Sequence, residues 1–215
     1  MRLELASTKA IKYAVMNWHY SKAVPIVTLA HAVFNDAGEW CGVICYGPGA
    51  NPNLHVPYGL KPGQAVELVR VALNGKQALT SQALSRSLKL VAKHCPLIEL
   101  IISYADTGQG HKGTIYQATN WTYTGAMKGH AKTIDPKTGK VAHPRTIHTL
   151  YGTQKGLKTI PGSEKLKYIY PISAKCRKLA KTLAQPYPKA KEAQTDERPG
   201  STEEVAGSIP SPSLT

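Results

Sequence analysis

Three short stretches of this 215-residue chain carry side chains suited to proton transfer. His19 and Tyr20 follow a segment with helical spacing, and histidine is the usual proton carrier near neutral pH. Asp106 ends an apolar run and precedes a glycine-containing turn, where open α/β sheets bind their ligands. Tyr116 lies in the helical pattern that follows, and its hydroxyl could serve as acid, base or ligand. These four residues are the candidate catalytic set.

Each candidate also has a purely structural interpretation. His19 would be a favourable cation at a helix C-terminus with Tyr20 packed beside it. Asp106 would be a turn or cap residue, and Tyr116 a core tyrosine with a satisfied hydroxyl. His19, Asp106 and Tyr116 together also form a candidate iron site, because mixed histidine and carboxylate ligands suit iron. Their spacing is not diagnostic of a metal, so iron stays an option.

The four cysteines point away from disulfides and zinc. Cys41, Cys45, Cys95 and Cys176 form no CxxC pair and no zinc-finger spacing. A reducing cytoplasm is the simplest compartment for them. No run of about 18 apolar residues is present, so we expect no contact with a membrane.

A second group of candidates would bind a phosphate or the donor of a transferred group. Arg70 lies in an apolar strand pattern three residues after Glu67, with which it would alternatively form an internal ion pair. Further along, hydroxyl and guanidinium groups gather where a helix is predicted to begin. The donor- or phosphate-binding candidates are Arg70, Ser81, Ser85 and Arg86.

The charge of the chain favours a polyanionic partner. Lys and Arg number 27 against 13 Asp and Glu, and residues 1–184 alone hold 24 bases and eight acids. A folded unit this basic usually binds nucleic acid, although a generally cationic surface is the alternative. We expect 128–165 to be an irregular basic insertion that binds DNA. The candidate DNA contacts are Lys22, His111, Lys112, Lys128, Lys132 and Arg145.

Hydrophobic periodicity and turn residues predict an α+β protein with one central mixed β-sheet flanked by helices. The expected strands are 2–6, 24–35, 40–46, 65–73, 98–104, 121–126 and 167–172. The expected helices are 8–18, capped by Ser7, a second that Thr80 or Ser81 caps and that ends near His94, then 111–120 and 174–183. Residues 185–215 are rich in Pro, Ser, Glu and Gly, which predicts a disordered tail after a domain spanning 1–184.

This order of elements resembles the GNAT fold of N-acyltransferases, with Ala65–Cys95 as its central strand and helix. Ile115–Gly125 is similar to the tyrosine-containing helix and strand of that family. The resemblance implies a GNAT-like catalytic domain and acetyl-CoA as donor. One feature departs from it, because the turn before the central helix contains only Gly75 where CoA-binding relatives have several glycines.

A more specific resemblance is to the Mom-type DNA-modification proteins of phages, over roughly residues 10–170. The blocks that carry it are His19-Tyr-Ser with Val24-Pro25, Glu67-Leu-Val-Arg70, Ser103-Tyr-Ala-Asp106 and Gly110 to Trp121. The resemblance implies conversion of adenine in double-stranded DNA to N6-carbamoylmethyladenine, which shields phage DNA from restriction. It also implies action in the cytoplasm of a bacterial host.

The implied product raises a question about the donor. A carbamoylmethyl group contains a nitrogen that an acetyl group lacks, whereas a glycyl group has the same atoms. Glycyl-tRNA is therefore an alternative donor, with tRNA as a further partner. The rival functions are a DNA-binding protein without catalysis and an N-acetyltransferase for a protein or small-molecule amine. Trp18, Trp121 or Tyr104 would stack on a flipped adenine, unless they are core residues.

Overall fold

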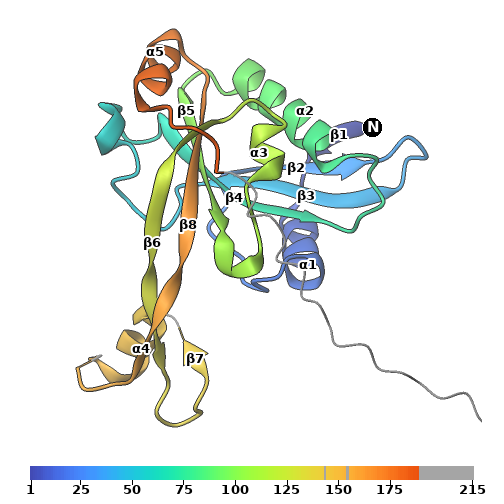
Figure 1. The fold of residues 1–215 in the computed structure, drawn as a ribbon. Coiled ribbons are helices and arrows are strands. Elements are labelled where there is room, and N and C mark those ends of the chain that lie inside the picture. The colour runs from blue at the N-terminus through green and yellow to red at the C-terminus, as the bar shows by residue number, and fades with distance from the viewer. Residues whose placement is uncertain (143, 154, 189–215) are drawn as a thin grey trace, which may run out of the picture.

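The fold is known from a computed structural model, which describes residues 1–142, 144–153 and 155–188. One eight-stranded sheet runs through it in the order β1-β2-β3-β4-β5-β8-β6-β7 (Figure 1). The strands are β1 (Arg2–Leu5), β2 (Leu29–Phe34), β3 (Trp40–Gly47), β4 (Ala65–Leu73), β5 (Leu100–Asp106), β6 (Thr122–Ile134), β7 (Val141–Ala142) and β8 (Thr159–Pro171). The helices are α1 (Thr8–Trp18), α2 (Thr80–His94), α3 (Thr114–Gln117), α4 (Pro144–Tyr151) and α5 (Ala174–Leu183), with 3-10 turns η1 (Val56–Tyr58) and η2 (Thr107–Gln109).

The predicted α+β class and mixed sheet are confirmed. Paired strands are antiparallel except β4 and β5, which are parallel and joined by α2. Alternate residues of β3 face opposite sides, so that Val43 and Cys45 pack with α1 while Ile44 and Tyr46 pack with α2. A further cluster under α5 buries Leu100 and Cys176. No helix in the described part of the chain is long and apolar enough to cross a membrane.

The helix boundaries follow local capping only in part. α1 has the predicted bounds, and the Ser7 hydroxyl accepts the Ala10 N–H at 3.2 Å. α2 begins with Leu79 as its N-cap and without a side-chain cap, so the predicted caps Thr80 and Ser81 were wrong by one or two residues.

The feature that makes room for a site is the separation of β4 from β5. The two strands pair only from Ala65 with Leu100 to Glu67 with Ile102, although both continue well beyond these residues. Past that point the Ser103 hydroxyl reaches the Leu68 carbonyl oxygen at 3.1 Å. A side chain thus bridges the start of an opening in an otherwise continuous sheet.

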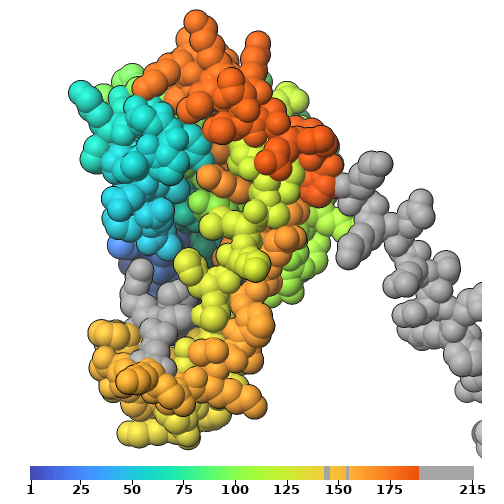
Figure 2. Space-filling model, turned by 60° about the vertical axis from the view of Figure 1, so that its left-hand side comes forward, coloured from blue at the N-terminus to red at the C-terminus, as the bar shows by residue number. Residues whose placement is uncertain are grey.

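The largest correction concerns the basic insertion, which is ordered β structure and not an irregular loop. β6 and β8 each run for 13 residues, where short strands at 121–126 and 167–172 were predicted. They form a two-stranded arm that projects from the body and carries β7 and α4 at its far end (Figure 1). Figure 2 shows this far end, in yellow and orange, extending beyond the rest of the molecule. The alternation that marks a strand was obscured because both faces of the arm are largely exposed.

Three other predictions were wrong in extent. Strand β2 begins at Leu29 and not at residue 24, because the chain around Pro25 is a connection without regular secondary structure. The expected helix 111–120 is the single turn α3. Of the expected disordered tail, Gln185 donates its N–H to the Tyr123 carbonyl and Tyr187 donates its hydroxyl to the Trp121 carbonyl. The rest of that prediction, residues 189–215, lies outside the described residues.

Candidate functional site

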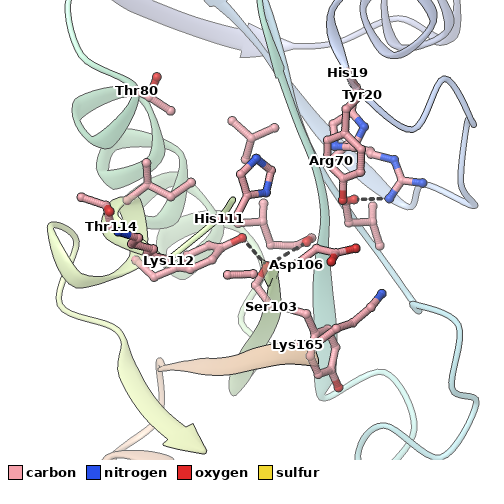
Figure 3. Close-up of a pocket in the computed structure, with 18 of the residues that line it drawn as sticks. His19, Tyr20, Arg70, Thr80, Ser103, Asp106, His111, Lys112, Thr114 and Lys165 are labelled. Atoms are coloured by element: carbon pink, nitrogen blue, oxygen red, sulfur yellow. Dashed lines mark hydrogen bonds between the residues drawn. The ribbon is translucent and has the colours of Figure 1, made fainter. Parts of the chain in front are cut away.

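A cavity of about 410 Å³ occupies the opening between β4 and β5. Figure 3 shows His19, Tyr20 and Arg70 on one side and Thr80, Lys112 and Thr114 on the other, with Ser103, Asp106 and His111 between them. Seven of the predicted site residues line this one cavity: His19, Tyr20, Arg70, Asp106, His111, Lys112 and Tyr116. They come from three stretches that are distant in the sequence, 19–20, 70 and 106–116, and the fold brings these together.

Asp106 is both a cap residue and a residue of the cavity, so its structural and its candidate catalytic interpretations are compatible. Its Oδ1 caps η2 by accepting the Gly108 N–H at 3.0 Å, and the Ser163 hydroxyl donates to the same oxygen. In the strand register Asp106 lies opposite Lys165 of β8. Because one oxygen is fixed by these donors, the carboxylate is oriented before any ligand arrives.

His19 is a neutral hydrogen-bond donor and not a strong base. Its Nδ1 accepts the Ser21 N–H at 3.1 Å, which leaves Nε2 to carry the ring proton. Burial, with smaller effects of Arg70, His111 and Lys22, lowers the pKa of His19 to about 4. The imidazole therefore stays uncharged at neutral pH beside several cationic groups.

Aromatic rings line the mouth of the cavity. The Tyr20 ring lies 4.4 Å from that of His19 and 5.4 Å from that of His111, and Tyr20 is 51% exposed. Burial, and then the charge of Asp106, raise the pKa of Tyr20, so the hydroxyl is protonated. The suggestion that Trp121 stacks on a base was wrong, because Trp121 is fully buried in the core. Trp18 packs against Tyr13 and Trp40 and does not line the cavity. Tyr104, the third suggestion, does line the cavity.

Tyr116 is buried, and its hydroxyl lies at the inner wall. The hydroxyls of Tyr116 and Ser103 are 2.9 Å apart, and Ser103 also bonds to Leu68 across the strand opening. Burial raises the pKa of Tyr116 to about 12, against a smaller opposite effect of the Ser103 bond. The phenol is thus a proton donor at neutral pH.

Arg70 is anchored to the backbone. Its Nε and Nη2 donate to the Ala23 carbonyl at 3.2 and 3.0 Å, and its Nη1 donates to the Val69 carbonyl. These bonds tie the connection that follows His19 to strand β4. The guanidinium thereby holds one wall of the cavity and places a positive charge beside it.

Two glycines shape the loop that carries His111 and Lys112. Gly110 ends η2 with a φ of +70°, and Gly113 precedes α3 with a φ of +76°. A β-carbon at Gly113 would lie 2.4 Å from the Tyr168 ring, so only glycine fits there. The Tyr168 hydroxyl in turn donates to the Lys112 carbonyl at 3.0 Å.

The remaining predicted residues lie elsewhere. Of the N-terminal turn of α2, only Thr80 lines the cavity, whereas Ser81, Ser85 and Arg86 do not. The Arg86 guanidinium donates to the Met1 carbonyl. Lys22 donates to the Asn17 carbonyl at 2.8 Å. The other three predicted DNA contacts belong to the arm, with Lys128 and Lys132 exposed on β6 and Arg145 in α4.

The candidate iron site does not fit the observed donors. Among the described residues, no group of three or more His, Cys, Asp or Glu side chains is placed to hold a metal. His19 Nδ1 is engaged by Ser21, and the Tyr116 hydroxyl is engaged by Ser103. His19 Nδ1 and the Tyr116 hydroxyl each have a hydrogen-bond partner within the protein.

Sequence reasoning missed two charged residues of the cavity, Glu67 and Lys165. Glu67 was considered only as a partner of Arg70, although an acid in an apolar strand was already a signal. Lys165 reaches the site only because β8 pairs with β5, which its position in a basic segment did not reveal.

The arrangement defines a class of protein: an α+β fold with a cavity lined by His, Asp and Tyr side chains in a sheet opening, and a basic two-stranded arm. A family model described as the Mom protein family matches residues 1–189, and the chain belongs to that family. It is 26% identical over 205 residues to methylcarbamoylase mom of Escherichia phage Mu, covering 88% of this chain and 84% of that protein.

Two N-acetyltransferases are among the solved structures to which the chain is similar. One is the spermidine/spermine N-acetyltransferase of Vibrio cholerae, with a TM-score of 0.47, 8% identity, and coverage of 82% of this chain and 95% of that chain. The other is the ribosomal-protein-alanine N-acetyltransferase of Brucella melitensis, with a TM-score of 0.45, 12% identity, and coverage of 80% and 99%.

Proposed function

We propose that this chain is a DNA-modifying transferase that converts adenine to N6-carbamoylmethyladenine and so shields phage DNA from restriction. Membership of the Mom family and the name of the phage Mu relative support this product. The observation that carries the proposal is the cavity in the strand opening, which gathers Asp106, His19 and Tyr116 around one space.

The acceptor side requires a base, because the lone pair of the adenine amine is delocalised into the ring. A proton must leave this nitrogen as it attacks, and both partners must be held close. Asp106 is the base in this proposal. Its Oδ1 is held by Gly108 and Ser163, which leaves the other oxygen to accept the proton. The neutral His19 donates its Nε2–H to the oxygen that becomes negatively charged during attack.

The leaving group requires an acid, and Tyr116 fills this role. Its raised pKa keeps the phenol protonated at neutral pH, and its bond to Ser103 fixes the hydroxyl at the inner wall. Transfer of that proton to the departing atom avoids release of an unstable anion.

The DNA side combines base stacking with backbone contacts. An adenine inside a duplex must be flipped out to enter the cavity, and the exposed Tyr20 ring offers a face for it. Residues 128–165 of the arm carry eight Lys and Arg against two acids. Lys128, Lys132 and Arg145 contact phosphates in this proposal, which gives affinity without reading sequence.

The experiment is mass spectrometry of nucleosides from the DNA of cells that express the chain. Carbamoylmethylated adenine is expected with the natural sequence and not with an Asp106→Asn variant that is equally abundant. Unmodified adenine together with DNA binding would instead identify a non-catalytic DNA-binding protein. Unmodified adenine together with acetylation of a protein or small-molecule amine would identify an ordinary N-acetyltransferase.

A further inference from the structure

One carboxylate in the cavity has no task in the mechanism above. Glu67 lies where β4 and β5 separate, and it lines the same space as Asp106 and Tyr116. The Ala50 N–H donates to it, and a β-carbon at Gly49 would lie 2.2 Å from its Oε2. Gly49 has a φ of +73°, so backbone that only glycine adopts easily is packed directly against this carboxylate.

The environment of Glu67 is suited to a cation that comes from outside the protein. Burial is the largest influence on this side chain and raises its pKa, while Lys165 and Arg70 act in the opposite direction. Among the residues that the structure describes, no Lys, Arg or His lies within ion-pairing distance of Glu67. A partly buried carboxylate without a salt bridge is costly unless a ligand supplies the positive charge.

The stoichiometry of the proposed product indicates what that ligand is. To build a carbamoylmethyl group from an acetyl group, a C–N bond must replace a methyl C–H bond. That route consumes ammonia and a two-electron oxidant. A glycyl group already contains both carbons, the oxygen and the nitrogen at the required oxidation level. Its conversion to carbamoylmethyl is an isomerisation, so a glycyl donor balances without a further reactant.

We propose that the donor is a glycyl ester, of the kind carried by glycyl-tRNA, and that Glu67 holds its amino group. This inference rests on the proposed adenine modification and names the donor for it. The adenine N6 attacks the glycyl carbonyl, a new C–N bond forms, and the ester C–O bond breaks. The proton from N6 passes to Asp106, and Tyr116 supplies a proton to the departing ribose oxygen.

The second step moves the substituent. The glycyl amine attacks ring carbon C6 through a five-membered ring, and the bond from C6 to the original exocyclic nitrogen breaks. A proton passes from the amine to that nitrogen, which becomes the carboxamide. The amine must first lose its ammonium proton to become a nucleophile. Glu67 is placed to bind the ammonium and to take this proton, and its raised pKa makes it a better base than an exposed carboxylate.

An isotope experiment tests the donor in cells that express the full chain. Glycine labelled at nitrogen is expected to place its label on the nitrogen bonded to C6, with both glycine carbons retained. Label from acetate without the glycine nitrogen would overturn the glycyl donor and leave the proposed adenine modification standing. A complete lack of modified adenine would instead overturn that function, and the donor assignment would fall with it.

A binding experiment tests Glu67 with the purified protein and an adenine-containing duplex. The probes are glycyl-tRNA and N-acetylglycyl-tRNA, whose amino group is blocked. The natural sequence should prefer glycyl-tRNA, and Glu67→Gln should raise the KM for glycyl-tRNA by about 10- to 100-fold, because a charged hydrogen bond is lost. The affinity for N-acetylglycyl-tRNA, measured by inhibition, should not change.

The control is Glu4→Gln, which removes the same charge from the exposed strand β1. It should leave unchanged both the KM for glycyl-tRNA and the inhibition constant of N-acetylglycyl-tRNA. Equal use of the two probes by the natural sequence would overturn the role of Glu67, and this comparison does not depend on any variant folding. An unchanged KM in a folded Glu67→Gln protein would overturn it as well.

Discussion

The cavity and the arm belong to the same β-sheet but are stabilised in different ways. In the cavity, hydrogen bonds of side chains hold the groups in place, as in the bonds from Arg70 to Ala23 and from Gly108 to Asp106. The arm is mostly backbone pairing between β6 and β8, with exposed lysines along its length. This difference fits the proposed function, because a transfer step needs its reacting groups held in fixed positions. Binding of a polyanion by the arm would need only a sufficient density of positive charge.

The two regions also differ in how their strands fit together. Beside the cavity, β5 pairs with β8 in unbroken register from Leu100 to Asp106. The pairing of β6 with β8 shifts register at three places, including both sides of Gly129. Such irregularities bend and twist a ribbon. A bent arm can follow a curved partner, whereas the cavity requires a rigid wall.

The largest expected difference between the two regions comes from Asp106→Asn, which should affect catalysis in the cavity and not DNA binding by the arm. The amide oxygen preserves the cap on η2, so the fold is retained, but the group can no longer accept the amine proton. We expect DNA modification to fall by about 100-fold or more, since a general base contributes that much. DNA affinity, which we assign to the arm, should not change. Nucleoside mass spectrometry and a DNA-binding titration measure the two properties, and normal modification by this variant would refute the role of Asp106.

Gly113→Ala and Gly139→Ala compare the rigidity of the two regions directly. Both glycines have a positive φ, of +76° and +66°, which costs an alanine about 1–2 kcal/mol. Only at Gly113 does the new β-carbon also collide with Tyr168, whereas Gly139 faces open space at the far end of the arm. We expect urea unfolding to show a loss of about 2–4 kcal/mol for Gly113→Ala and about 1 kcal/mol for Gly139→Ala. Equal losses would show that the loop beside the cavity is not tightly packed.

Replacing Lys128 and Lys132 together by alanine tests the arm. If each lysine neutralises one phosphate, the salt dependence of DNA binding becomes shallower by about 2 on a log–log plot. The rate at saturating DNA should stay the same because neither residue lines the cavity. The paired replacement of the exposed Lys89 and Lys93 on α2 removes the same charge from the body and should leave the slope unchanged. A slope that changes equally in both variants would argue against a dedicated arm.

The predictability of the two regions differs for a physical reason. Asp106, His19 and Tyr116 could be selected because residue type limits proton chemistry, and their proximity was implied by a family resemblance. The place of Glu67 in the cavity was not predicted, because it depends on the β4–β5 separation and on the Gly49 turn, which are properties of the tertiary structure. The strands of the arm were not predicted in full, because strands exposed on both faces lose the alternation of apolar and polar residues. Its basic charge was predictable, but its shape was not.

The smallest expected effect is a change in the pKa of His19, which tests how closely the cavity residues are coupled. Burial lowers this pKa first, and the charge of Arg70 is the next cause. Arg70→Gln should therefore move the pKa from about 4 part of the way to the ordinary 6.5, as read from the ring-proton NMR signals during a pH titration. Arg70→Lys keeps the charge and loses the fork of bonds to Ala23, so the pKa should stay low.

The same shift has a consequence for stability, with a definite sign. Because the pKa of His19 is lower in the folded state, the unfolded chain takes up the proton first as the pH falls below 6.5. Folding stability should then decline between about pH 6.5 and 4, and this decline should be smaller in Arg70→Gln than in Arg70→Lys. Identical pH dependence in the two variants would mean that Arg70 acts on His19 only through the position of the connecting loop. Arg70 would then influence the pKa of His19 through packing and not through its charge. The charge of the guanidinium would remain available to bind the donor.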